Sequence, residues 1–402
     1  MNHHPWRRVG GTWGVVLVLL AVLPAGAQHL PARGTASTFE AATWNINWFG
    51  SPANGPSDEE QQLRNVARVI RESEIDLWAV QEIDDAAHFQ RLLDELGAEW
   101  AGEISRTGSN FKLGFVYRRD VIFVRQKSAI LTSHAADFAG RPPLQIEADV
   151  MLPADTLQVV FINLHMKAFG DDRSYDQRVA GARLLKEHVD IHLTHRAVVI
   201  LGDFNDELGS SISNGRPSPY QELLEASDEY AFLSWTLDVR DARTFCATST
   251  CSAGSTFDHI LVTNEIVDAY DVASAETYAE VLGIVEGYTT TTSDHLPVYA
   301  RFGTGSSTGY ERRSGRTSPS LTVYPNPFVA STAIEYEMNV PGPAGLTLYD
   351  VMGRVVRRHV DPYRATGMHR FRVDGSGLAA GVYMAQVDAP GGRLTARVVR
   401  IH

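Results

Sequence analysis

The strongest fold signal in the sequence is the stretch Ala197-Val198-Val199-Ile200-Leu201-Gly202-Asp203-Phe204-Asn205-Asp206. Its continuous run of β-branched and aliphatic residues predicts a strand that is buried on both faces. Asp203 and Asn205 follow two residues apart, so an extended backbone points both side chains the same way. A carboxylate and an amide there suit a hard divalent cation or a phosphate, while a polar loop after a core strand fits equally well.

Five other strand-like segments also carry polar side chains at one end. A single residue of this kind is usually structural, whereas six such placements on one domain predict one shared site at the rim of a sheet. The five placements are Asn45 in 39–49, Glu82 in 76–83, His165 after 157–163, Asp258 in 256–263, and Asp294 with His295 before 296–302.

The residue types indicate a metal-assisted hydrolytic site. Glu82 can hold Mg²⁺ or Mn²⁺ directly, and Ca²⁺ is a further option, with Asn45 positioning this carboxylate or ligating through its own carbonyl. Asp294 is the third expected metal ligand. We expect His295 to act as general base, or to hold phosphoryl oxygens if it is protonated, with Asp258 fixing its tautomer.

The remaining polar residues have expected roles around the reacting phosphate. Asp203 would orient or deprotonate an attacking water, while Asn205 and His165 would hold the transition-state oxygens. Lys167 and Arg178 are expected phosphate contacts, although solvated surface charge is an equally good interpretation. Further basic residues that could track a strand backbone are Arg106, Lys112, Arg118, Arg119 and Arg173.

The periodicity predicts an α/β fold. Helical spacing is found after Ser57, over 89–96 up to Gly97, and over 175–193. Between these helices, 111–117 with 121–125, and 145–151 with 157–163, are expected to form hairpin pairs. This mixture excludes a simple doubly wound parallel sheet and favours two packed sheets with helices outside.

The chain of 402 residues exceeds one ordinary domain and carries a formal net charge of −12, which argues against a generally basic nucleic-acid-binding surface. Arg7 and Arg8, a short apolar run and Ala25-Gly26-Ala27 predict a signal peptide over residues 1–27, with no membrane span after its removal. In an exported protein, the two cysteines, Cys246 and Cys251, are expected to form a disulfide.

The composition changes near residue 303. We expect a catalytic domain over 28–303, then a Gly/Ser/Thr/Arg linker over 304–319 without apolar periodicity. Residues 320–402 contain short alternating strands between Gly, Pro and Asp turns, which predicts a small all-β sandwich.

At this point the motifs resemble a known family. The segments Trp44-Asn45-Ile46-Asn47-Trp48-Phe49, Gln81-Glu82-Ile83, Asn163-Leu164-His165, Gly202-Asp203-Phe204-Asn205, Phe257-Asp258-His259 and Ser293-Asp294-His295-Leu296-Pro297-Val298 are similar, in order, to the motifs of the endonuclease/exonuclease/phosphatase family. The resemblance implies a four-layer α/β sandwich, divalent-metal dependence, and hydrolysis by activated water with inversion at phosphorus. It places Glu82 and Asn45 at the metal and Asp258 behind His295. Asn47 departs from the acidic residue that many members carry.

The C-terminal segment has its own resemblance. Val323-Tyr324-Pro325-Asn326-Pro327-Phe328, Leu348-Tyr349-Asp350-Val351-Met352-Gly353-Arg354 and Ala380-Gly381-Val382-Tyr383 are similar to the C-terminal sorting domain of the type IX (Por) secretion system. This implies contact with that secretion machinery and release or attachment at the cell surface. The alternative is an accessory sandwich that binds substrate or carbohydrate.

Together these observations predict a secreted or cell-surface, metal-dependent phosphodiesterase, a monomer that acts as a nuclease on extracellular DNA or RNA. The first alternative is a phosphomonoesterase or a lipid phosphodiesterase, of the sphingomyelinase or inositol phosphatase type, on the same scaffold. The second alternative is a catalytically silent binding module.

Overall fold

The computed structural model describes residues 28–107, 111–153, 155–226, 229–239, 242–267, 269–271, 274–303, 321–338, 340–352, 354–390 and 392–401. The predicted signal peptide (1–27) and the predicted linker (304–319) lie outside these residues. Within the described parts of the chain, we find no helix with the length and apolarity needed to cross a membrane.

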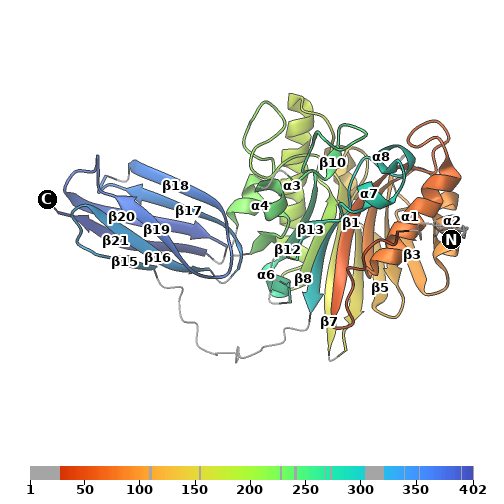
Figure 1. The fold of residues 1–402 in the computed structure, drawn as a ribbon, viewed down its shortest axis with the longest axis horizontal. Coiled ribbons are helices and arrows are strands. Elements are labelled where there is room, and N and C mark those ends of the chain that lie inside the picture. Colours follow the sequence, from red (N-terminus) through yellow and green to blue (C-terminus); the bar gives the residue numbers. More distant parts are fainter. Residues whose placement is uncertain are drawn as a thin grey trace, which may run out of the picture.

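Two six-stranded sheets form the body of the first region (Figure 1). In the first sheet, β1 and β2 are parallel and the other pairs are antiparallel. Its strands, in spatial order, are β13 (Glu276–Thr277), β14 (Val298–Gly303), β1 (Thr38–Phe49), β2 (Leu77–Ile83), β4 (Lys112–Arg118) and β3 (Trp100–Ile104).

The second sheet is also mixed, with β7 and β8 as its parallel pair. Its strands, in spatial order, are β5 (Ile122–Ala129), β6 (Leu144–Met151), β7 (Thr156–His165), β8 (Ala197–Asp203), β12 (Asp258–Thr263) and β9 (Tyr230–Phe232). A separate two-stranded ribbon, β10 (Phe245–Cys246) with β11 (Gly254–Ser255), carries the expected disulfide between Cys246 and Cys251.

Long helices cover the outer faces of the sheets. α1 (Glu59–Ser73) and α2 (Ala86–Leu96) pack on the first sheet, and α3 (Asp172–His192) packs on the second. The cap of α1 is Asp58, the residue after Ser57, and its side chain accepts from the Gln61 N–H at 2.9 Å. Shorter helices are η1 (Thr132–Phe138), α4 (Gln221–Glu225), α5 (Trp235–Val239), α6 (Asn264–Val267), α7 (Val281–Ile284) and α8 (Tyr288–Thr291).

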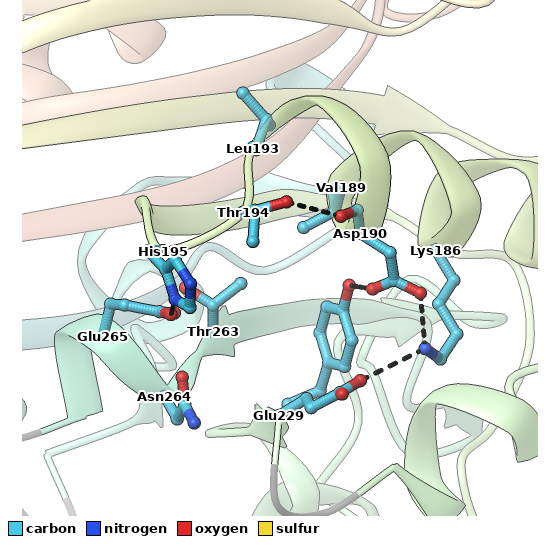
Figure 2. A pocket seen from close by; sticks show the side chains of 11 residues that line it. Lys186, Val189, Asp190, Leu193, Thr194, His195, Glu229, Thr263, Asn264 and Glu265 are labelled. Atoms are coloured by element: carbon cyan, nitrogen blue, oxygen red, sulfur yellow. Dashed lines mark hydrogen bonds and ion pairs between the residues drawn. The ribbon is translucent and has the colours of Figure 1, made fainter.

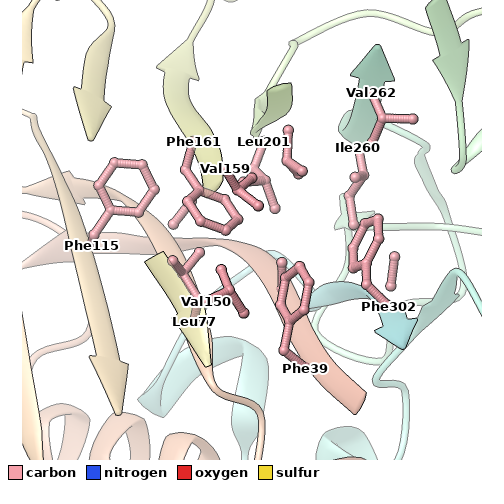
Figure 3. Packing of buried hydrophobic residues seen from close by; sticks show 14 of the residues in the cluster. Phe39, Leu77, Phe115, Val150, Val159, Phe161, Leu201, Ile260, Val262 and Phe302 are labelled. Carbon is pink, nitrogen blue, oxygen red and sulfur yellow. The ribbon is translucent and has the colours of Figure 1, made fainter. Parts of the chain in front are cut away.

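The central core lies between the two sheets. Figure 3 shows side chains from both sheets meeting there, among them Phe39 and Phe302 from the first sheet and Phe161 and Leu201 from the second. Because strand side chains alternate, the other residues of these strands, such as Trp44 and Ile200, face the outer helices. Helix, sheet, sheet and helix are therefore stacked in four layers, which confirms the expected α/β sandwich.

One of the two expected hairpins is wrong. β6 and β7 pair as predicted, but β4 belongs to the first sheet and β5 to the second, so the segments 111–117 and 121–125 do not pair. The turn at Arg119 and Asp120 therefore carries the chain from one sheet to the other. Local alternation is the same for a hairpin and for a crossing between sheets, so it could not distinguish them.

The C-terminal region is all-β, as expected. β15 (Leu321–Tyr324), β16 (Ser331–Met338) and β19 (Gly367–Asp374) form one sheet, and β18 (Val355–Arg364), β17 (Gly342–Tyr349), β20 (Gly381–Ala389) and β21 (Gly392–Arg400) form another. One apolar cluster joins the two sheets and includes Tyr336, Phe371, Leu348 and Val387.

A buried arginine ties α3 to the loops that follow β7 and β8. The Arg178 Nε atom donates to Asp206 Oδ2 at 2.9 Å, and Nη2 donates to Ser213 Oγ at 2.9 Å. Nη1 donates to the carbonyls of Lys167 and Phe169, both at 2.7 Å, and the Arg178 side chain has no solvent exposure. A substrate phosphate cannot reach this guanidinium, so a structural role replaces the expected phosphate contact of Arg178.

Replacing Arg178 with Met should lower the free energy of unfolding by about 3–5 kcal/mol, because Asp206 would stay buried without its partner. Urea unfolding followed by tryptophan fluorescence measures this change. Arg183→Met, at an exposed position of the same helix, is the matched control and should change stability little. Equal stability of the two variants would contradict the structural role.

A second buried polar contact lies at the end of the first sheet where β2 begins. The Glu40 N–H donates to Asp76 Oδ2 at 3.1 Å, and both carboxyl groups are almost fully buried. Arg301 Nε lies 3.2 Å from Glu40, while Arg118 lies 3.9 Å from Asp76. Burial raises the pKa of Asp76 to about 8, and the adjacent Glu40 carboxylate adds to the rise.

This raised pKa makes the stability of the fold depend on pH. The folded chain keeps a proton on Asp76 that the unfolded chain releases above its ordinary pKa of 3.8, so stability should fall as the pH rises from about 4 to about 8. Asp76→Asn should remove part of this slope, whereas Asp120→Asn, at an exposed carboxylate, should not. Urea midpoints measured from pH 5 to pH 9 give the comparison, and identical slopes for wild type and Asp76→Asn would contradict it.

Candidate active site

The candidate site occupies one open end of the core between the sheets. Along β1, β7, β8 and β12, the residues that face the other sheet are apolar until the last positions near this end. The same alternating register then places polar side chains there: Asn45, His165, Asp203 and Asp258. All four are buried. The structure therefore brings together residues that are up to 213 positions apart, from Asn45 to Asp258.

A layer of amides separates the site from the apolar core below it. Gln81 Nε2 donates to Asn163 Oδ1 at 2.8 Å, which links β2 of one sheet to β7 of the other. Asn163 Nδ2 donates in turn to the carbonyls of Val80 and Gly114 at 3.0 and 2.8 Å. Neither amide was expected at the site from the sequence, although alternation along their strands places both between the sheets.

Glu82 reaches the site through an unusual backbone. Trp78 and Val80 face the outer helices, and alternation predicts the same direction for Glu82. Its φ of +63° places it in the left-handed region, and its carboxylate meets β1 instead. There Oε1 accepts from Asn45 Nδ2 at 3.1 Å, and Oε2 accepts from the Trp48 N–H at 3.1 Å.

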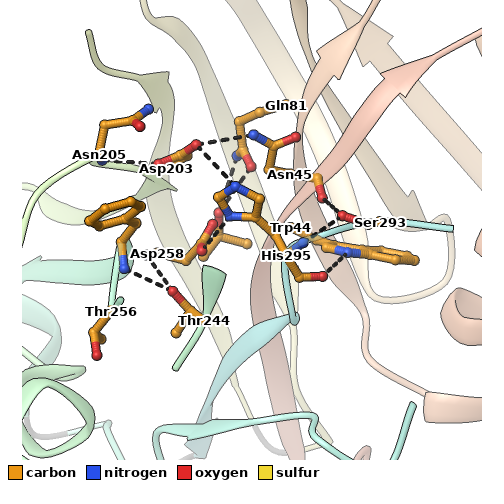
Figure 4. A network of polar contacts seen from close by, with 12 residues as sticks. Trp44, Asn45, Gln81, Asp203, Asn205, Thr244, Thr256, Asp258, Ser293 and His295 are labelled. Atoms are coloured by element: carbon orange, nitrogen blue, oxygen red, sulfur yellow. Dashed lines mark hydrogen bonds and ion pairs between the residues drawn. The ribbon is translucent and has the colours of Figure 1, made fainter. Parts of the chain in front are cut away.

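Asn45 joins the two sheets at the site. Its Nδ2 donates to Glu82 of the first sheet. The same Nδ2 also donates, at 3.0 Å, to Asp203 Oδ2 of the second sheet (Figure 4). Its Oδ1 accepts from the Asn47 N–H at 3.0 Å. In this orientation Asn45 contacts one carboxylate of each sheet.

His295 lies between two carboxylates. Its Nδ1 is 2.8 Å from Asp258 Oδ2, and its Nε2 is 3.8 Å from Asp203 Oδ2 (Figure 4). Burial by itself would lower the pKa of His295, but the charges of Asp258 and Asp203 outweigh burial and raise it well above the usual value. An imidazolium is therefore the favoured form in the metal-free protein.

Contacts to the main chain hold His295 in place. Ser293 Oγ donates to the Asn45 carbonyl at 2.6 Å and accepts from the His295 N–H at 2.9 Å. Trp44 Nε1 and the Tyr288 hydroxyl donate to the His295 carbonyl at 3.2 and 2.6 Å. These bonds connect the histidine segment to β1, which also supplies Asn45.

Asp203 and Asn205 lie at the end of β8. The Asn205 N–H donates to Asp203 Oδ1 at 2.9 Å, and Asn205 adopts a left-handed φ of +54°. Burial raises the pKa of Asp203 to about 7, with Asp258 and Glu82 adding to the rise and His295 opposing it. The Asp203 carboxyl group can therefore gain or lose a proton near neutral pH.

His165 completes the ring around Asp203. Its Nε2 lies 3.4 Å from Asp203 Oδ2 and 3.9 Å from Glu82 Oε1. Burial lowers the pKa of His165 well below its usual value, and the charges of Arg141, His295 and Lys167 lower it further. A neutral imidazole here can donate a hydrogen bond without adding charge.

Arg141 is a site residue that the sequence analysis did not identify. Its Nε and Nη2 donate to the carbonyls of His165 and Met166 at 3.2 and 2.8 Å, and its guanidinium carbon lies 5.7 Å from the Phe111 ring centroid. Burial lowers its pKa, while Glu82 and Asp203 act in the opposite direction. Arg141 lies in an irregular loop, and no periodicity marks such a position.

The donor set at this end of the core fits a divalent cation. Burial raises the pKa of Glu82, and the like charge of Asp294 adds to the rise, as expected where carboxylates gather without a cation. Asp203, Asp258 and His295 also place ligand atoms within 4.8 Å of one another. Asp258 Oδ2 is already bonded to His295, whereas the charge of Asp294 acts on Glu82, so the site contains carboxylates besides the Asp258–His295 pair.

The other predicted basic contacts are dispersed. Lys167 remains near the site, since its charge acts on His165, and Arg173 lines the same cavity as Lys167. Arg118 is the last residue of β4 and lies at the end of the sheet opposite the candidate site, where its guanidinium binds Asp120. Arg119 donates to the Trp100 carbonyl. Lys112 lies beside β2, where its ammonium is 3.4 Å from the Asp84 carbonyl. For Arg106 the structure shows only an exposed side chain.

A further cavity, of about 430 Å³, lies at the other end of β8 (Figure 2). Its charged groups are internally paired: Lys186 binds both Asp190 and Glu229, and His195 lies 3.8 Å from Glu265. His195 precedes β8, whereas Asp203 ends it. This cavity is therefore separate from the candidate active site.

Comparison with solved structures supports the same fold. A protein described as an endonuclease/exonuclease/phosphatase from Beutenbergia cavernae is 16% identical with a TM-score of 0.52, and the match covers 90% of this chain and all of that one. One of the same description from Bacteroides vulgatus is 21% identical with a TM-score of 0.51, covering 66% of this chain and 98% of that one. No curated protein matches the sequence at a significant level.

Two family matches divide the chain. Residues 322–401 match the secretion system C-terminal sorting domain, which indicates export and a secreted or cell-surface location. Residues 42–295 match the endonuclease/exonuclease/phosphatase family, whose members are metal-dependent phosphoric ester hydrolases. That match spans more than half of the sequence and contains every predicted catalytic and metal-binding residue. The chain therefore belongs to the endonuclease/exonuclease/phosphatase family.

Proposed function

We propose that this protein is an exported, divalent-metal-dependent phosphodiesterase that acts as a nuclease on extracellular nucleic acid. The observation that carries the proposal is the arrangement around Asp203. On one side are Glu82 and Asn45, and on the other is the His295–Asp258 pair. A water and a phosphate placed between these groups would meet a base, a cation site and hydrogen-bond donors together.

For the metal, we propose Glu82 and Asp294 as ligands, with Asn45 either orienting Glu82 or turning its carbonyl inward. Mg²⁺ or Mn²⁺ suits such oxygen ligands, with Ca²⁺ as a further option. A bound cation would polarise the phosphoryl oxygens and neutralise developing charge.

The proton chemistry is assigned to the chain's own residues. Asp203, with a pKa of about 7, suits the role of base that receives the water proton on Oδ2. The raised pKa of His295 favours the second of its expected roles, in which the imidazolium donates from Nε2 to a phosphoryl oxygen while Asp258 holds Nδ1. Asn205 and neutral His165 would donate to the remaining oxygens, and Arg141 and Lys167 would supply positive charge beside them.

Aromatic rings near the site favour a nucleic-acid substrate over a simple phosphomonoester. Trp48 and Phe111 pack with ring centroids 4.1 Å apart near Arg141, and Phe245 and Phe257 stack at 5.5 Å beside His295. Aromatic faces next to a phosphate site suit bases. The excess of acidic residues in 28–303 weakens binding to long polyanions, however, and keeps a small phosphoester or a lipid phosphodiester as the alternative.

The domain organisation extends this proposal. Residues 1–27 would be removed on export, 28–303 would form the catalytic domain, and 304–319 would connect it to the sorting domain at 320–402. We further propose that the protein is a monomer and that its C-terminal domain engages type IX secretion machinery.

The substrate is tested with the full chain, freed of metal and then supplied with Mg²⁺, Mn²⁺ or chelator. Substrates are plasmid DNA, RNA, bis-p-nitrophenyl phosphate, p-nitrophenyl phosphate and sphingomyelin. Metal-dependent nicking of plasmid or cleavage of RNA, with little monoester turnover, supports the nuclease. Turnover of the monoester or of sphingomyelin, with the nucleic acid left intact, would support a phosphomonoesterase or a lipid phosphodiesterase instead. Inactivity on every substrate would support the catalytically silent binding module.

Glu82→Gln and His295→Ala should separate the two sides of the site. Loss of Glu82 should lower kcat by roughly 100-fold or more and weaken Mn²⁺ binding in calorimetry, because a ligand is lost. His295→Ala should lower kcat by about 10²–10⁴-fold with Mn²⁺ binding little changed.

The matched controls are Glu95→Gln and His192→Ala, both at exposed positions outside the site. Circular dichroism confirms folding of each variant. Wild-type turnover in either site variant would overturn its assignment.

A further inference from the structure

A shallow cavity of about 540 Å³ lies beside the candidate site, between the η1 loop and the start of α3. Its lining includes Ala136, Gly140, Lys167, Phe169, Arg173 and Gln177. We propose that this cavity, the Phe169 subsite, binds one unpaired nucleotide of a nucleic-acid strand next to the phosphodiester that is cleaved. The proposal rests on the proposed nuclease function and adds the strand state of its substrate.

The Phe169 subsite lies close to the candidate site. Lys167 follows His165 by two residues, so their Cα atoms are at most about 8 Å apart. The Lys167 charge acts on His165, and Gly140 of the cavity directly precedes Arg141. A strand whose phosphate lies at Asp203 and Arg141 would therefore pass into this cavity.

The Phe169 side chain is exposed to solvent rather than packed in the core. Its side chain is 68% exposed and its φ is +82°, a conformation that is strained for a residue with a bulky side chain. The buried Arg178 holds this conformation, since its Nη1 binds the carbonyls of both Lys167 and Phe169. Lys167 Nζ lies 4.7 Å from the Phe169 ring centroid. A strained backbone held by a buried ion pair keeps an aromatic ring and an ammonium together at the surface.

The charge of the Phe169 subsite contrasts with that of its surroundings. Residues 28–303 contain nearly twice as many acidic as basic side chains, yet the cavity carries Lys167 and Arg173. Asp171 is the one carboxylate among its described lining residues, and both its oxygens accept hydrogen bonds from Ser174, at 3.0 and 2.6 Å. This local positive charge suits the backbone phosphate on either side of a stacked base.

These features favour a nucleic acid over a lipid surface. Membrane contact needs a protruding apolar segment, whereas Phe169 lines a concavity with polar neighbours such as Gln177. The other strongly exposed apolar side chains described in 28–303 lie on other elements: Phe123 and Met151 on the paired strands β5 and β6, and Ile191 on α3. A base that stacks on Phe169 must be unpaired, so the subsite should favour single strands, with little dependence on sequence.

Fluorescence anisotropy of a labelled single-stranded oligonucleotide, with the full chain in chelator, tests the subsite without cleavage. Phe169→Ala should raise Kd by about tenfold, and Arg173→Ala by several-fold. The matched controls are Phe123→Ala, 62% exposed on β5, and the exposed Arg183→Ala further along α3. Both controls should bind like wild type. The same oligonucleotide as a duplex should bind more weakly than the single strand and respond less to Phe169→Ala.

The KM for metal-supported cleavage of the same oligonucleotide provides a second measure and should follow the same order. Equal Kd and KM for Phe169→Ala and Phe123→Ala, in an enzyme that does cleave nucleic acid, would overturn the subsite and leave the proposed function intact. Failure of the wild-type chain to bind or cleave any nucleic acid would overturn both. A selective loss of binding to sphingomyelin or phosphatidylserine vesicles in Phe169→Ala, with oligonucleotide binding unchanged, would assign the surface to lipid instead.

Discussion

The contact on which the site depends is the pair of hydrogen bonds from Asn45 to Glu82 and Asp203. One amide nitrogen binds a carboxylate of each sheet, so the spacing of the sheets sets the geometry of the site. The Gln81–Asn163 bond repeats this link one layer deeper. Each sheet alone carries only part of the polar set. The site therefore exists only when the two inner faces are packed, which makes folding and assembly of the site one event.

Burial determines the electrostatics at this end of the core. Asp203 is buried in a small volume of low dielectric, where burial and the like charges of Asp258 and Glu82 oppose its ionisation. Two positive groups offset this negative charge. The His295 imidazolium lies between two of the carboxylates, and Arg141 is held against main-chain carbonyls. A divalent cation would complete the neutralisation, which is why the donor set agrees with the metal dependence of the family.

Sequence reasoning succeeded where strand alternation extends to the strand end. Asn45, Asp203 and Asp258 follow the inward register of apolar neighbours, so their meeting could be inferred from the pattern alone. Glu82 breaks this register, and its residue type and place at a strand end, rather than alternation, pointed to the site. Arg141 lies in an irregular loop and carried no signal. Arg178 was misjudged because a helical arginine has the same appearance in a sequence whether it faces solvent or Asp206. The β4–β5 hairpin failed for a similar reason, since the partner of a strand is not encoded in its own alternation.

The sequence by itself determined the chemical inventory: the ordered polar strand ends, the α/β class, the separate C-terminal β region and the resemblance that named the family. Only the tertiary structure decided which groups touch. In the folded chain His295 lies between Asp258 and Asp203, and the left-handed backbone of Glu82 directs its carboxylate to the site. Arg178 is buried, whereas Phe169 is exposed beside Lys167. The reason is physical: periodicity records which face a side chain takes within its own element. Charge state, pairing and exposure depend on neighbours that are distant in sequence and meet only when the layers pack.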